Sequence, residues 1–181
     1  MPIIVRLFQF LPLSVFLYFS RQNIETGEAN WAPAFQAGAL AAVLELMILI
    51  PILKAKISRL ITAVNLYLII GGLAFFLNLI GLLNLIGKLR ETGLLMTVIF
   101  VVLLSIVLTK SGAFENAPDD SMNARKYSIY FLGWCVIATV FSWMNKGQLQ
   151  LAGVVPFISL IIVKYFLWRR LNSDYIHKKK N

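Results

Sequence analysis

This sequence contains few charged residues and few of the side chains that build catalytic or metal-binding sites. Charged residues make up 14% of its 181 residues, whereas about 25% is usual for a soluble domain. It has one cysteine, Cys135, and one histidine, His177, which argues against a disulfide framework and a cysteine–histidine metal site. It also lacks a glycine-rich phosphate-binding loop, an H-E-x-x-H motif and a G-x-S-x-G motif. We therefore expect a non-enzymatic protein that binds no cofactor and no metal.

Long apolar segments dominate the chain. Hydrophobic residues make up 59% of it, and its mean hydropathy is +0.79. Six apolar segments can be drawn, at residues 3–20, 32–53, 60–86, 92–109, 127–144 and 149–168. About 20 residues of helix cross the hydrocarbon core of a bilayer. The sequence therefore predicts an all-α bundle of six transmembrane helices, or five if the first segment does not span. This bundle covers residues 1–168, and a basic cytoplasmic tail, 169–181, follows it.

The segment at 60–86 is longer than one crossing of the bilayer requires. Its 27 residues would form a helix of ~40 Å, against a hydrocarbon core of ~30 Å. We expect this segment to tilt, to kink at the glycine pair Gly71 and Gly72, or to leave the membrane early.

The net charge is +9, and the basic residues flank the apolar segments. This distribution is typical of residues that set the orientation of a membrane protein, so we expect no nucleic-acid partner. Twelve of the 17 lysines and arginines lie on one side if the six segments alternate in direction: at Arg6, in loops 54–59 and 110–126, and in the tail. Four lie on the other side, at Arg21, Lys88, Arg90 and Lys146. This bias predicts that both termini of a six-span protein are cytoplasmic, whereas with five spans only the N-terminus changes side.

Glu45 is a carboxylate inside the second apolar segment. Ala34, Gly38, Ala41 and Glu45 are spaced four, three and four residues apart, so they share one face of a helix. Small residues on a helix face allow a second helix to approach closely. We therefore expect Glu45 to point at protein or at a wet cavity, and not at lipid.

Other polar residues inside the apolar segments are Asn65, Asn78 and Lys164. Either Asn65 or Lys164 is expected to lie within reach of Glu45, although the Lys164 side chain is long enough to turn to the interface instead. One interpretation makes Glu45, Asn65 and Lys164 a proton or ion relay, as in a small channel or proton-coupled transporter. The alternative, which we favour, makes them hydrogen-bonding contacts between packed helices.

A second close-packing face is predicted on the third segment. Gly71, Ala74, Asn78 and Gly81 recur at helical spacing there, which combines small residues with one hydrogen-bonding group. The residues expected to bring helices together are Gly38, Ala41, Gly71, Gly72 and Gly81.

The longest loop, 110–126, contains the acidic residues Glu115, Asp119 and Asp120. No histidine accompanies them at the spacing of metal ligands. We expect the acidic pair Asp119 and Asp120 to cap a helix that begins there, or to be solvated.

The end of the chain contains a cluster of basic residues directly after the last apolar segment. These residues are Arg169, Arg170, Lys178, Lys179 and Lys180. Such clusters bind anionic lipid head groups with about 1 kcal/mol per residue near the surface. We expect the tail to bind anionic lipids, to set the orientation of the protein, or both.

Two stretches resemble the bacterial intracellular septation protein A family. LFQFLPLSVFLYF, at 7–19, is similar to the opening of that family, in which an aromatic-rich segment contains Phe-Leu-Pro-Leu. ITAVNLYLIIGGLAFF, at 61–76, is similar to its Gly-Gly-Leu region with paired phenylalanines. Family members are usually described with five spans. The polar stretch that follows their paired phenylalanines is replaced here by the apolar residues 77–86.

The resemblance implies a non-enzymatic protein of the bacterial cytoplasmic (inner) membrane that supports cell-envelope synthesis, septation and membrane integrity through partner membrane proteins. It implies no catalytic residues. The expected partners are therefore membrane lipids and proteins of the envelope or division machinery, and a homo-oligomer is also compatible with the packing faces.

Overall fold

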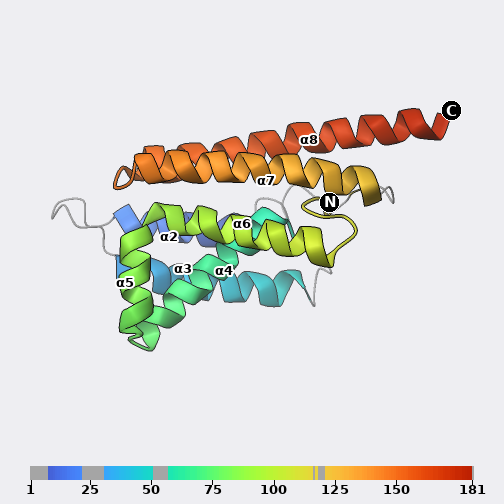
Figure 1. Ribbon diagram of the computed structural model, residues 1–181. Coiled ribbons are helices and arrows are strands. Elements are labelled where there is room, and N and C mark those ends of the chain that lie inside the picture. The colour runs from blue at the N-terminus through green and yellow to red at the C-terminus, as the bar shows by residue number, and fades with distance from the viewer. Residues whose placement is uncertain (1–7, 22–30, 51–56, 116, 118–120, 181) are drawn as a thin grey trace. The chain divides into compact units, whose positions relative to one another are not determined.

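A computed structural model describes residues 8–21, 31–50, 57–115, 117 and 121–180 (Figure 1). Every regular element in these ranges is helical: α2 (Leu11–Arg21), α3 (Trp31–Leu49), α4 (Arg59–Phe76), α5 (Ile80–Leu89), α6 (Glu91–Leu108), α7 (Ser121–Met144), the π-helix η2 (Leu149–Val154) and α8 (Val155–Lys180). Five of them, α3, α4, α6, α7 and α8, are long and apolar enough to cross a membrane. The expected all-α membrane bundle is thereby confirmed.

The chain divides into two compact units, and each is described by itself. The first unit contains α2, α3, α5 and α4 from Ile61 onward, whereas the second contains residues 58–60, α6, α7, η2 and α8. As described, α2 has 11 residues and α5 has 10, so both are shorter than the ~20 residues that a perpendicular crossing needs.

Phe35 organises the interior of the first unit. It lies on α3 and is fully buried. Its ring centroid lies 5.0 Å from that of Phe16 on α2, and 5.3 and 5.8 Å from those of Tyr67 and Phe75 on α4. Aromatic pairs at such separations are favoured beyond the area that they bury. One side chain therefore joins three helices.

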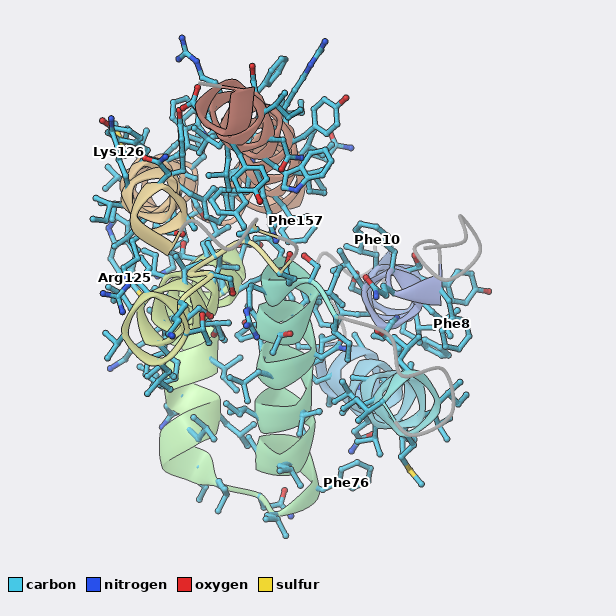
Figure 2. The ribbon with its side chains drawn as sticks, turned by 90° about the vertical axis from the view of Figure 1, so that its right-hand side faces the viewer. Phe8, Phe10, Phe76, Arg125, Lys126 and Phe157 are labelled. Carbon is cyan, nitrogen blue, oxygen red and sulfur yellow. The ribbon has the colours of Figure 1, made fainter. Side chains whose placement is uncertain are left out.

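The long third apolar segment divides into α4 and α5 at Asn78. Asn78 has φ = 49°, a left-handed conformation that asparagine tolerates better than most residues. The N–H of Leu79 donates to the carbonyl oxygen of Ala74 at 3.0 Å, which is the Schellman bond that closes a helix C-terminus. Helix α4 thus ends at Phe76, labelled in Figure 2, and continues without a break through the glycine pair that we considered as a kink.

This ending corrects two sequence expectations. Asn78 and Gly81 lie beyond the end of α4, and both are exposed. Among the described residues, no atom outside the local helix lies within 4 Å of where a Cβ of Gly81 would stand. They therefore do not extend the packing face of α4. The left-handed residue Asn78 turns the chain away from the axis of α4. Gly71 and Gly81 therefore do not share a helix face, although their spacing in the sequence is helical.

In the second unit α7 packs against both α6 and α8, and the three run beside one another in Figure 1. The buried face of α6 includes Leu95, Val98 and Val102, at the spacing of one helical stripe. On α7, Phe131 and Cys135 are buried, so the thiol of this chain belongs to the packed interior.

The last apolar segment begins with a widened turn and continues beyond its predicted end. Pro156 lacks the N–H that an α-helix would bond to Ala152, and the π-helix η2 occupies the turn before it. From there α8 runs without interruption to Lys180. The basic tail, including Arg169 and Arg170, is therefore a continuation of the last helix.

Candidate functional site

Glu45 and Asn65 form a buried polar pair in the first unit. Glu45 is 0% exposed on α3, and Asn65 is 1% exposed on α4. The side chain of Asn65 lies beside the carboxyl group of Glu45, but the two do not meet in hydrogen-bond geometry. Within the described residues, both carboxylate oxygens of Glu45 and both polar atoms of the Asn65 side chain have no hydrogen-bond partner.

Two glycines of α4 allow α3 to approach it closely. A Cβ at Gly71 would stand 2.2 Å from Cδ1 of Phe35, and one at Gly72 would stand 2.3 Å from Cβ of Ala39. Both distances are far shorter than any real contact, so no larger residue fits without movement.

The small residues of α3 occupy the matching face. A Cβ at Gly38 would lie 3.2 Å from both a methyl group of Leu68 and Cβ of Phe16. Ala41 is buried one turn before Glu45. The two helices thus meet through small residues over several turns.

Lys164 is the centre of a second buried polar cluster, which lies in the second unit. Its ammonium nitrogen, Nζ, lies 2.8 Å from Oε1 and 3.1 Å from Oε2 of Glu115 and donates to Oγ of Ser58 at 3.0 Å. The Lys164 and Glu115 side chains are 13% and 15% exposed. The charge of the lysine is therefore compensated inside the protein by a carboxylate from the longest loop.

This cluster differs from one sequence expectation. Lys164 was a candidate partner for Glu45, but its ion pair is with Glu115. Glu115, whose partner we did not identify from the sequence, is largely buried and also accepts a hydrogen bond from the backbone N–H of Arg59. Arg59 is the first residue of α4, whose N–H groups lack partners within the helix, so Glu115 acts as a cap supplied by a distant segment. Asp119 and Asp120 lie outside the described residues.

A third polar contact lies where α6 begins and α7 ends. The hydroxyl groups of Thr92 and Ser142 are 3.1 Å apart, and both side chains are buried. The N–H of Gly147 points to a carboxylate oxygen of Glu91 at 3.5 Å. We did not identify these residues from the sequence, because hydroxyl groups inside apolar helices are common and carry no spacing signal of their own.

Tyr127 joins α7 to the basic end of α8. Its hydroxyl donates to the carboxylate of Asp174 at 2.6 Å. Arg169 and Arg170 are exposed on the same stretch of α8, and Arg125 and Lys126 are exposed at the beginning of α7 (Figure 2). This end of the second unit is therefore strongly basic, while Lys178, Lys179 and Lys180 extend the helix further.

No protein-family model, curated protein or solved structure matches this chain. The candidate site must therefore be interpreted from its own geometry. Among the described residues, no group of three histidine, cysteine, aspartate or glutamate side chains is placed to hold a metal ion.

The polar contacts of the described residues are of two kinds. Lys164, Thr92 and Tyr127 each contact a polar side chain of another segment. Such contacts fix helices against one another in an apolar medium. The Glu45–Asn65 pair is different, because its polar atoms are buried without partners in the described part of the chain. In a membrane an ionisable residue of this kind is a candidate functional group.

Proposed function

We propose that this chain is a non-enzymatic structural and interaction protein of the bacterial cytoplasmic membrane. In this role it supports cell-envelope synthesis, septation and membrane integrity by binding partner membrane proteins. The observation that carries the proposal is the ion pair of Lys164 with Glu115. Because that pair is internal, the intramembrane lysine acts as a contact between segments of a scaffold.

The outer surface of the second unit supports a role in binding partners within the membrane. Large apolar side chains are exposed along α7 and α8, among them Ile137, Phe141, Ile162 and Phe166. Of the five long apolar segments, the one at 150–176, which contains most of α8, is the least buried. Of the 18 residues in its most apolar stretch, 22% are buried, against 50% for α4. In a bilayer this surface contacts lipid tails or the apolar helices of another protein.

The resemblance of 7–19 and 61–76 to the septation protein A family supports the choice of cellular process. In that family partner proteins of the envelope and division machinery are expected. The basic bias of the loops and the C-terminal helix supports a cytoplasmic location for the C-terminus.

Site-specific photo-cross-linking in growing cells tests this proposal. A photoreactive residue at Ile162 or Phe166, both exposed on α8, is expected to form adducts with an envelope-synthesis or division protein. The matched control is Leu160, on the same helix but fully buried, where only adducts within the chain are expected. Depletion of the protein should also lengthen cells or sensitise them to envelope stress. Lipid adducts alone from every exposed position, with normal division, would reject the proposal.

A second candidate function is a small channel or proton-coupled transporter that uses Glu45. It is favoured by the complete burial of Glu45 beside Asn65. Purified protein in sealed vesicles would then move protons or a solute, and Glu45→Gln would abolish that flux. Absence of flux in vesicles that contain folded wild-type protein would reject this candidate and leave the first untouched.

A further inference from the structure

The polar atoms of the Glu45–Asn65 pair match one particular hydrogen-bonded arrangement. Four of its atoms, Oε1 and Oε2 of Glu45 and Oδ1 and Nδ2 of Asn65, are buried without a partner in the described part of the chain. Buried polar groups are almost always hydrogen-bonded, and each one that is not requires an explanation. These four belong to two side chains that lie beside each other.

We propose that Glu45 and Asn65 form a proton-binding site in which Glu45 is a neutral carboxylic acid paired with the carboxamide of Asn65. In this arrangement the acid O–H donates to Oδ1 of Asn65, while Nδ2 donates to the carbonyl oxygen of the acid. One proton thus satisfies all four atoms at once. Either orientation of the amide is open to it, because rotation about its last side-chain bond exchanges the oxygen and the nitrogen.

The ionised form of Glu45 cannot satisfy the same atoms. A carboxylate only accepts hydrogen bonds, so it could use one N–H of Asn65 but would leave Oδ1 unpaired. It would also leave a charge in a fully buried position, which is very costly unless a cation compensates it. The geometry of the pair therefore selects the protonated acid.

Among the side chains described in the first unit, the one cation is Lys88, which is exposed on α5. On the helices packed against α3, Tyr18 of α2 is exposed, and Tyr67 of α4 has its ring against Phe35. Arg59 is the first residue of α4 but belongs to the second unit. Lys164, the intramembrane cation, is paired with Glu115 in the other unit.

The position of the pair on its helices also suits a proton site. Glu45 lies four residues before the end of α3, and Asn65 lies six residues after the start of α4, so they are ~6 and ~9 Å from the helix ends that the 50–58 connection joins. Both residues therefore lie within two helical turns of the described ends of their helices. This inference does not depend on the partner-based function proposed above, because a scaffold and a transporter could both contain such a pair.

Labelling with a hydrophobic carbodiimide tests the proposal on the full-length protein in lipid nanodiscs. The reagent takes the acid proton on one nitrogen, and the carboxyl oxygen adds to its central carbon, so it reacts with a protonated carboxyl group. Mass spectrometry is expected to find the adduct at Glu45 at neutral pH. Glu45→Gln should lose it completely.

Exchange of the acid and the amide provides the sharpest variant. Glu45→Gln combined with Asn65→Asp restores an acid–amide pair with the two roles reversed, and the label is expected to move to position 65. The exchanged protein should melt close to the wild type, since all four atoms are again satisfied. A protein in which Glu45 served only to fill space would show no transfer of the label.

Infrared difference spectroscopy decides the case if the carbodiimide fails to reach the pair. Wild type minus Glu45→Gln should contain the carbonyl stretch of a protonated carboxylic acid at neutral pH, shifted by exchange into heavy water. A carboxylate band in its place would show that Glu45 is ionised and would overturn the proposal. If Glu45→Gln does not fold, the exchanged variant replaces it, and wild type minus this variant should contain two acid carbonyl bands of opposite sign, one from position 45 and one from position 65.

Discussion

Nζ of Lys164 lies 2.8 Å from Oε1 of Glu115, across 49 residues of sequence. The same carboxylate accepts the backbone N–H of Arg59. One loop residue thus neutralises an intramembrane lysine and caps the first turn of α4.

The first prediction concerns this ion pair. Glu115→Gln keeps an acceptor for the Arg59 N–H but leaves Lys164 without a counter-charge, so it should lower the free energy of unfolding by about 3–5 kcal/mol. The double variant Glu115→Gln with Lys164→Met removes the uncompensated charge and should be more stable than Glu115→Gln alone. Thermal unfolding in detergent measures both.

The control for that comparison is Lys126→Met, since Lys126 is a basic residue exposed on α7. It should change stability by less than about 0.5 kcal/mol. If Glu115→Gln is as stable as this control, the lysine does not depend on Glu115.

The second prediction concerns the close approach of α3 and α4. Gly72→Ala introduces a methyl group 2.3 Å from Cβ of Ala39, beside the backbone oxygen of Phe35 at 3.1 Å. Neither atom is the end of a flexible side chain, so the helices must separate, at a cost of about 1–3 kcal/mol. Gly81→Ala is the matched control, because a methyl group there meets open space. Equal melting temperatures for the two variants would contradict the packing of these helices.

The third prediction concerns orientation. In a Cys135→Ala background, cysteine at Gln148 and at Lys110 samples the two ends of the second unit, and both native residues are exposed. The charge bias predicts that an impermeant thiol reagent labels Gln148→Cys in intact spheroplasts and labels Lys110→Cys only after permeabilisation. The reverse pattern would place the basic loops outside.

The fourth prediction concerns lipid binding along α8. Because the helix is continuous to Lys180, Lys179 lies ~15 Å beyond Arg169, which exceeds the Debye length of ~8 Å at physiological salt. Arg169→Gln with Arg170→Gln should therefore reduce the preference for anionic lipid more than substitution of Lys178, Lys179 and Lys180 by glutamine. Lipid enrichment in mixed nanodiscs measures this.

Added salt provides the control for lipid binding. At 1 M salt the Debye length falls to ~3 Å, so the preference for anionic lipid should largely disappear in the wild type. If the lysine variant loses more than the arginine variant, the end of α8 must lie along the membrane surface.

The sequence alone determined the class of the protein and the packing face of α3. Apolar runs of about 20 residues must satisfy their own backbone hydrogen bonds in a bilayer, so composition and length are enough to predict helices. The spacing of Gly38, Ala41 and Glu45 determined one helix face, because helical periodicity is a local property. It therefore also predicted that Glu45 is buried.

Tertiary structure decided which groups meet. The pairing of Lys164 with Glu115 depends on how a loop folds over distant helix ends, and no local periodicity encodes it. The end of α4 at Phe76 was also not evident from the sequence, since an apolar run continues through residues 77–86 although Asn78 turns the backbone. Helical spacing predicts neighbours only within one continuous helix. Gly81 was therefore assigned to the packing face of α4, although it lies beyond the end of that helix. Hydrogen bonds and ion pairs require contact at about 3 Å, and distance along the sequence does not reveal which groups make such contact.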